Sequence, residues 1–209
     1  RQVRHKSYVF GSYTIEAQYN PRRIISSAAR VDDKSIRERP CFLCRHNRPS
    51  QQIELTFEED YLILVNPFPV FDKHLTIPSV AHQPQEIANR FGVMLNLAAY
   101  LRDFAIIYNG PRCGASAPDH FHFQSVRKEV LPVVRDFEAM YNVSLTAAVK
   151  GIKVFSWEDY LRYPITFVSA DRNDLDKFFG HLYLVLQREM NTNEEPMMNM
   201  LTYHTGEEW

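Results

Sequence analysis

Short runs of alternating apolar and polar residues dominate the first two thirds of the chain, which is the pattern of half-buried strands. β-Branched and aromatic residues are concentrated in 53–57 and 61–65, and a third run closes at 75–78, so we expect three strands in a meander. Two further strands are expected at 104–108 and 120–126, the first of them uniformly apolar and therefore buried. The pattern predicts a sheet built from the middle of the chain.

One long stretch between these strands has the period of a helix instead. Its apolar residues recur every three or four positions, and Pro84 suits the first turn of a helix over about 84–103. The stripe consists of Ile87, Phe91, Met94, Leu95, Ala98 and Leu101. We expect this stripe to pack on the sheet.

A second group of elements follows further along the chain. Residues 152–155 and 165–169 have strand composition, Asp171 is placed to cap a long amphipathic helix, and 197–203 has the composition of another strand. The order strand, helix, strand therefore occurs twice. A duplicated half would give this order, and so would an ordinary α+β sheet.

These elements divide the chain into three parts. Residues 1–40 show weak alternation and a charged run, so we expect an irregular basic arm with one short strand or helix. Residues 41–130 form the unit that carries the chemical motifs, and 131–209 form a second α/β unit packed on the same core. The expected fold class is α+β.

The composition is that of a globular protein, because 45% of the 209 residues are hydrophobic, enough to bury a full core. No apolar run approaches the roughly 18 residues that span a bilayer, and the first residues lack the apolar segment of a signal peptide. We therefore expect a cytoplasmic protein with no membrane partner. The chain stops at Trp209, directly after an expected strand and turn, which predicts a truncated C-terminus.

The net charge of −1 conceals an asymmetry, because residues 1–50 carry eleven Lys or Arg and only four Asp or Glu. This basic end either faces a polyanionic ligand or is a solvated arm. The sequence has no basic stripe interleaved with aromatic residues, so we expect no nucleic-acid partner.

The most informative motif is the run HFHFQ that begins at His120. In an extended strand His120, His122 and Gln124 point to one side, and the two phenylalanines between them point to the other. A loop rich in small residues precedes the motif. Two imidazoles and an amide beside such a loop suit a site where a neutral histidine attacks phosphorus and backbone N–H groups hold the phosphate oxygens. A half-buried strand that carries two histidines without chemistry is the alternative.

Cys41 and Cys44 have the CxxC spacing with which two thiolates grip one tetrahedral zinc ion. The ion would need two more nitrogen or sulfur ligands, for which His74, His82 and His120 are candidates. A redox pair or simple burial would also account for the two cysteines, although the sequence lacks the context of a thioredoxin-like site.

Residues 109–124, which end in the HxHxQ motif, resemble the active-site segment of the histidine triad (HIT) superfamily, specifically its nucleotidyltransferase branch. That branch includes galactose-1-phosphate uridylyltransferase, diadenosine tetraphosphate phosphorylase and GDP-L-galactose phosphorylase. The segments 64–70 and 74–78 resemble the part of the phosphorylases that cradles the nucleoside, and 198–209 is similar to their late strand. The resemblance implies a HIT-like antiparallel sheet with long helices packed on it.

Under this resemblance His122 is the nucleophile, and it forms a covalent nucleotidyl-histidine from a phosphoanhydride such as a dinucleoside polyphosphate or an NDP-sugar. The implied ligands of a structural zinc ion are Cys41, Cys44, His82 and His120. His82 is preferred to His74 because His74 lies where a strand begins. Gln124 replaces the third histidine of the hydrolytic branch, a replacement that goes with transfer to inorganic phosphate or a sugar phosphate.

The resemblance also assigns substrate contacts to Asn66, Phe68, Asn109, Gly114, Ala115 and Ser116. The last three hold phosphate oxygens, the two asparagines touch the nucleotide, and the phenylalanine packs near the base. Between Ser116 and His120 this chain has one residue more than the family arrangement. Because a neighbouring subunit can contribute residues in related dimers, a homodimer is a further expectation.

Two other interpretations keep the same fold. A HIT-type nucleotide hydrolase would use the same strand, with water as the acceptor. A non-catalytic, zinc-stabilised nucleotide-binding module would use the same residues without turnover.

Overall fold

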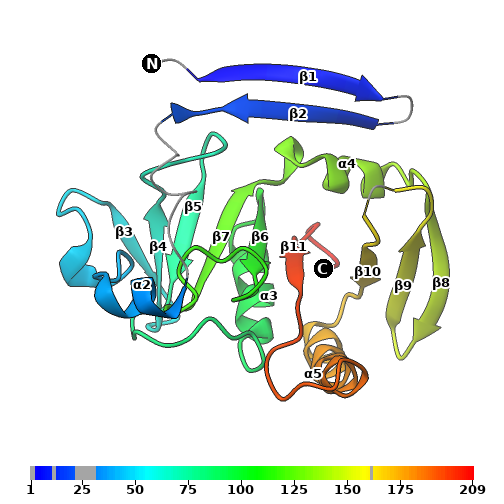
Figure 1. The fold of residues 1–209 in the computed structure, drawn as a ribbon. Coiled ribbons are helices and arrows are strands. Elements are labelled where there is room, and N and C mark those ends of the chain that lie inside the picture. Colours follow the sequence, from blue (N-terminus) through cyan, green and yellow to red (C-terminus); the bar gives the residue numbers. More distant parts are fainter. Residues whose placement is uncertain (1–2, 11–12, 22–31, 161) are drawn as a thin grey trace.

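The computed structural model describes residues 3–10, 13–21, 32–160 and 162–209 (Figure 1). Among these residues, six strands form one antiparallel sheet in the order β11–β6–β7–β5–β4–β3. The strands are β3 (Glu54–Phe57), β4 (Tyr61–Val65), β5 (Leu75–Pro78), β6 (Phe104–Asn109), β7 (His122–Arg127) and β11 (Asn199–Thr202). Each lies within two residues of an expected strand, and the fold class is α+β.

The hydrophobic core receives the two phenylalanines of the HFHFQ run. Phe121 and Phe123 are fully buried, beside helices α3 (Phe91–Tyr100) and α5 (Arg172–Glu189), which pack against each other. The same core contains Ile77, Met94, Leu97, Ile106, Tyr108, Phe179 and Tyr183. Because side chains alternate along a strand, this burial turns His122 and Gln124 of β7 away from the core.

Helix α3 is shorter than the helix expected over 84–103. The backbone N–H of Ile87 donates to the carboxylate of Glu195 at 2.6 Å, and that of Gln85 donates to a loop carbonyl at 3.0 Å. These N–H groups therefore have partners outside any helix. The helix begins at Phe91 after a turn at residues 88–90, so Phe91, Met94, Leu95 and Ala98 of the apolar stripe are helical, and Ile87 and Leu101 lie outside the helix.

The N-terminal arm holds more regular structure than the one short element expected. Strands β1 (Arg4–Phe10) and β2 (Tyr13–Tyr19) form an antiparallel hairpin, and helix α2 (Asp33–Glu38) follows. The hairpin lies across the top of the view in Figure 1, apart from the six-stranded sheet. Every residue of β1 is exposed, so backbone pairing rather than a buried face defines the strand. This explains the weak alternation in the sequence.

The second half also contains helix α4 and a separate three-stranded antiparallel sheet with the order β10–β9–β8. Their bounds are α4 (Pro132–Glu138), β8 (Val143–Val149), β9 (Ile152–Trp157) and β10 (Ile165–Val168). The sequence predicts β9, β10 and α5, and Asp171 caps α5 by accepting hydrogen bonds from the next N–H groups. It does not predict α4 or β8. Strand β8 is exposed along most of its length and interrupted by a bulge, so it lacks a clear period.

The structure does not confirm a duplicated half. Strand β11 pairs with β6 and extends the first sheet, and α5 packs on α3. The other strands of the second half form their own small sheet instead of a copy of the first. The division into units 41–130 and 131–209 stays a prediction. Among the described residues, no helix combines the length and apolar character needed to cross a membrane.

Candidate functional site

The four side chains predicted to bind metal come together. The ligand atoms of Cys41, Cys44, His82 and His120 all lie within 4.8 Å of one another. The distances from sulfur to nitrogen are 3.2 Å for Cys41 to His120, 3.6 Å for Cys44 to His120 and 3.3 Å for Cys44 to His82. Tetrahedral zinc, with Zn–S bonds of about 2.3 Å and Zn–N bonds of about 2.0 Å, places sulfur and nitrogen about 3.5 Å apart. The group could therefore hold a metal ion.

The fold brings these ligands from three segments. A turn in which the Cys44 N–H donates to the Cys41 carbonyl at 3.2 Å holds the two thiols near each other. His82 follows β5 and His120 precedes β7, and these two strands are neighbours in the sheet. Two donors thus come from one turn and two from adjacent strand ends, which is a closed set of four with no position left for substrate.

The ring of His120 is fixed in one orientation. Its Nε2 lies 2.8 Å from the carbonyl oxygen of Ser79, and since a carbonyl only accepts, Nε2 carries the proton. The other nitrogen, Nδ1, is then bare and faces the two sulfurs. Burial lowers the pKa of His120, which favours the neutral ring that a metal requires.

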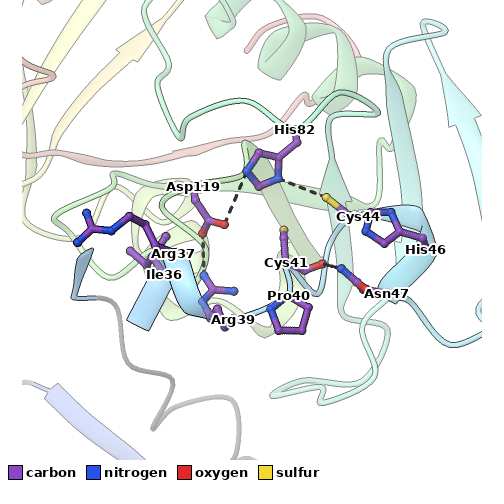
Figure 2. Close-up of a pocket in the computed structure, with 10 residues that line it drawn as sticks. All are labelled: Ile36, Arg37, Arg39, Pro40, Cys41, Cys44, His46, Asn47, His82 and Asp119. Atoms are coloured by element: carbon purple, nitrogen blue, oxygen red, sulfur yellow. Dashed lines mark hydrogen bonds and ion pairs between the residues drawn. The ribbon is translucent and has the colours of Figure 1, made fainter. Parts of the chain in front are cut away.

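The carboxylate of Asp119 lies beside His82 of the cluster (Figure 2). Asp119 is 3.9 Å from Nε2 of His82, and its other oxygen pairs with Arg39 at 2.7 Å. A carboxylate beside the free nitrogen of a metal-binding histidine is a common outer-shell arrangement that orients the ring. Asp119 and Arg39 also line an open pocket beside the cluster. No motif in the sequence marks Asp119 or Arg39 for this position.

His122 is the second imidazole of the motif and lies outside the cluster. Its side chain is 3% exposed, and its Nδ1 lies 2.9 Å from the carbonyl oxygen of His120. Nδ1 must therefore donate, which leaves Nε2 with a free lone pair. Burial lowers the pKa of His122 to about 4, so the ring is neutral at physiological pH. A neutral ring with a bare, oriented nitrogen is a ready nucleophile.

Gln124 is held by a histidine of the adjacent strand end. The Val70 N–H donates to Nδ1 of His74 at 3.2 Å, so Nε2 of His74 carries the proton and donates to Oε1 of Gln124 at 2.9 Å. The NH₂ group of Gln124 is then turned away from His74 and is free to donate elsewhere. His74, the alternative metal ligand, thus orients the amide and takes no part in the cluster.

The loop after β4 carries two predicted nucleotide contacts, Asn66 and Phe68, and is bonded to the row of the sheet that contains Gln124. Leu64, Thr76 and Gln124 are cross-strand neighbours. Asn66 donates to the hydroxyl of Thr76 at 2.9 Å and accepts from the N–H of Phe68 at 2.8 Å. The asparagine therefore shapes the loop, and the ring of Phe68 is 37% exposed. Their contact with a nucleotide stays a prediction.

The predicted phosphate-binding loop follows β6, where Asn109 is the last strand residue. Gly114 has a φ of +101°, a conformation that favours glycine, and so permits the tight bend. The Ala115 N–H donates to the Gly110 carbonyl at a long 3.4 Å, so binding a phosphate oxygen would require that weak bond to be exchanged. Ser116 lies half-buried in the same loop. The role of these residues in phosphate binding stays a prediction.

One further buried side chain lies at the site and was not expected from the sequence. Gln85 is 2% exposed, and its amide bonds to both backbone groups of His122 and to the carbonyl of Asn109. The sequence carries no local signal for this role, since Gln85 falls in a stretch with helical periodicity and bonds to residues far along the chain.

One family model matches this chain. The model of a family described as Domain of unknown function (DUF4922) matches residues 1–127, more than half of the 209 residues. The chain belongs to the DUF4922 family. The matched region of this DUF4922 protein includes the metal-ligand cluster, His122 and Gln124. A comparison with curated proteins found no match.

Solved structures show which fold this DUF4922 chain has. The crystal structure of yeast Ap4A phosphorylase Apa2 in complex with AMP is similar to it with a TM-score of 0.53 and 14% identity, over 96% of this chain and 68% of the other. Two further structures of yeast Apa2, one in complex with Ap4A, have TM-scores of 0.47 at 15% and 13% identity, cover 99% of this chain and are covered over 69% and 71%. The comparison rests on the first structure, and at this identity it shows the fold alone. This chain therefore shares the fold of that phosphorylase, which is consistent with the HIT-like fold expected from the HxHxQ segment.

Zinc content tests the cluster. The purified chain should contain about one zinc ion, and Cys44→Ser should lose it, because a serine hydroxyl does not replace a thiolate ligand. Cys113→Ser is the matched control, since Cys113 is the third free cysteine and lies outside the cluster. Elemental analysis gives the ratio of metal to chain. Equal zinc in both variants, or none in the wild type, would contradict the assignment.

Proposed function

We propose that this protein is a nucleotidyltransferase of the phosphorylase type that acts on a nucleotide phosphoanhydride through a covalent nucleotidyl-histidine at His122. The observation that carries the proposal is the hydrogen bond from Nδ1 of His122 to the carbonyl of His120, which leaves Nε2 bare in a buried, neutral ring. Such a nitrogen needs no general base to become a nucleophile. The substrate class is a dinucleoside polyphosphate or an NDP-sugar.

The first step forms a bond between Nε2 of His122 and the α-phosphorus, while the bond from phosphorus to the bridging oxygen breaks. The leaving group, which is a nucleoside polyphosphate for a dinucleoside polyphosphate or a sugar phosphate for an NDP-sugar, departs with that electron pair. In the second step an oxygen of the acceptor attacks the same phosphorus, the P–N bond breaks, and its electron pair returns to Nε2. Because His122 is 3% exposed, substrate reaches the ring only when neighbouring groups move apart.

Gln124 is the proposed donor to the non-bridging oxygens. His74 occupies the carbonyl of the Gln124 amide, so its NH₂ group is available for the phosphate, where charge develops during transfer. A preorganised donor of this kind is worth about 3–4 kcal/mol in comparable oxyanion sites. We assign further phosphate contacts to Gly114, Ala115 and Ser116. Asn66, Phe68 and Asn109 would contact the nucleoside.

The proposed metal at the cysteine–histidine cluster is zinc, and its role is structural. When bound, it supplies a cross-link between the CxxC turn and the strand ends, because all four positions are filled by protein. His120 contributes its ring to this cluster and its carbonyl oxygen to His122. The cluster thereby holds the peptide against which the nucleophile is oriented.

The fold comparison supports a phosphorylase and leaves the acceptor as part of the proposal. Yeast Apa2 is described as an Ap4A phosphorylase, in a structure with AMP. For this chain we propose inorganic phosphate or a sugar phosphate as the acceptor. A homodimer also stays a prediction.

Covalent labelling tests the nucleophile. Wild-type protein incubated with α-³²P-labelled Ap4A, or with a labelled NDP-sugar, should retain acid-labile, base-stable label, as a P–N bond does. His122→Ala should retain none. His181→Ala is the control, because His181 lies exposed on α5 and should label like wild type. Label that survives in His122→Ala would overturn the assignment.

Product analysis separates transfer from hydrolysis. The wild type should release a nucleoside diphosphate when the acceptor is inorganic phosphate or an NDP-sugar when it is a sugar phosphate, and without either acceptor it should stop after a single stoichiometric burst. A continuous, phosphate-independent release of nucleoside monophosphate would identify a hydrolase. Binding of nucleotide without either product would identify a non-catalytic module.

A further inference from the structure

The ladder between β6 and β7 ends at the position of the nucleophile. The strands pair from Phe104 opposite Arg127 to Ile107 opposite Gln124. The same register continued by two residues would bring Asn109 opposite His122. Among the described residues, that pair is not joined by the ladder, and β6 there pairs with β11 on its other side.

The side chain of Gln85 occupies the place where the two strands separate. Its Oε1 accepts from the His122 N–H at 2.8 Å, and its Nε2 donates to the His122 carbonyl at 3.0 Å and to the Asn109 carbonyl at 3.0 Å. One amide thus makes to His122 the two hydrogen bonds that a neighbouring strand would make. It also ties the end of β6 to the same point.

The chemistry of this position requires glutamine. Both N–H bonds of the NH₂ group have a carbonyl acceptor, and the amide oxygen has a backbone donor, so the group is satisfied in one orientation. Glutamate would keep the acceptor but place a carboxylate oxygen against two carbonyl oxygens. Asparagine is one methylene shorter and does not reach both strands. The Gln85 N–H donates to the Pro118 carbonyl at 3.0 Å, which fixes the backbone from which the side chain extends.

We propose that Gln85 is the positioning residue of the nucleophile: its amide replaces the missing strand at His122, and so holds the imidazole in line while β6 leaves the sheet for the loop that begins at Gly110. This inference rests on the proposed function of His122. Without the Gln85 amide, the backbone N–H and carbonyl of His122 would each lose a hydrogen bond, and the imidazole would no longer be held in its orientation. A displacement of about 1 Å at a reacting group can cost about 100-fold in rate.

Single-turnover labelling of Gln85→Leu tests the proposal. Leucine keeps the volume and removes the amide, so the rate of label transfer to His122 should fall about 100-fold, while the Kd for nucleotide and the zinc content change less than about threefold. Gln187→Leu is the matched control, because the Gln187 amide also donates to two backbone carbonyls, those of Asn193 and Glu194, at the end of α5. It should transfer label at the wild-type rate.

A merely structural role for Gln85 would lower the melting temperature and leave the transfer rate of the folded fraction unchanged, which would overturn the proposal. If Gln85→Leu does not fold, Gln85→Met carries the same test, since methionine is unbranched like glutamine, fits the same space and also lacks the amide. If the wild type does not label at all, the proposed function fails. The positioning role of Gln85 is then tested separately, by measuring the tautomer of the His122 ring with ¹⁵N NMR. A single Nδ1–H tautomer in wild type that becomes mixed in the variant supports positioning, and an unchanged tautomer contradicts it.

Discussion

The hydrogen bond from the His122 ring to the His120 carbonyl is the interaction on which the site depends. A neutral imidazole has two tautomers, and only a fixed acceptor at Nδ1 commits the lone pair to Nε2. That acceptor belongs to a residue whose own ring is held by the Ser79 carbonyl and lies against the cysteine pair. The two histidines, which are separated by one residue, therefore have different roles. The first anchors the backbone, and the second is left neutral and oriented.

The sheet supports these roles in two ways. Burial of Phe121 and Phe123 anchors the motif in the core from both sides of His122, so the His122 ring cannot turn to the other face without exposing two aromatic rings. The hydrogen-bonded ladder between β7 and β6 stops at Gln124. At His122 the Gln85 amide takes the place of β6, while β6 itself turns into the glycine-bearing loop. The backbone of His122 thus stays hydrogen-bonded although the backbone beside it is irregular.

The sequence could predict those parts that follow from local pattern. The period of two along β7 predicted which side chains enter the core. The CxxC spacing predicted a pair of metal-binding cysteines, and the resemblance to the HIT superfamily selected His82 and His120 as the other two ligands of the cluster. The roles of Gln85 and His74 could not be predicted, because each acts through hydrogen bonds to residues 37 and 50 positions away, which no periodicity records. The helix was expected to begin at residue 84, but it begins at Phe91. The N–H groups of the residues before it bond to groups far along the chain, which the periodicity does not show either. The exposed hairpin β1–β2 left little signal, since it buries no face.

A crystal structure of the wild-type chain reacted with nucleotide substrate while the acceptor is withheld tests the central claim most directly. The account predicts continuous density from the α-phosphorus to Nε2 of His122, with Nδ1 of the same ring still about 2.9 Å from the His120 carbonyl oxygen. A phosphorus bonded to Nδ1 or to another side chain, or a His122 ring turned away from that carbonyl, would contradict it.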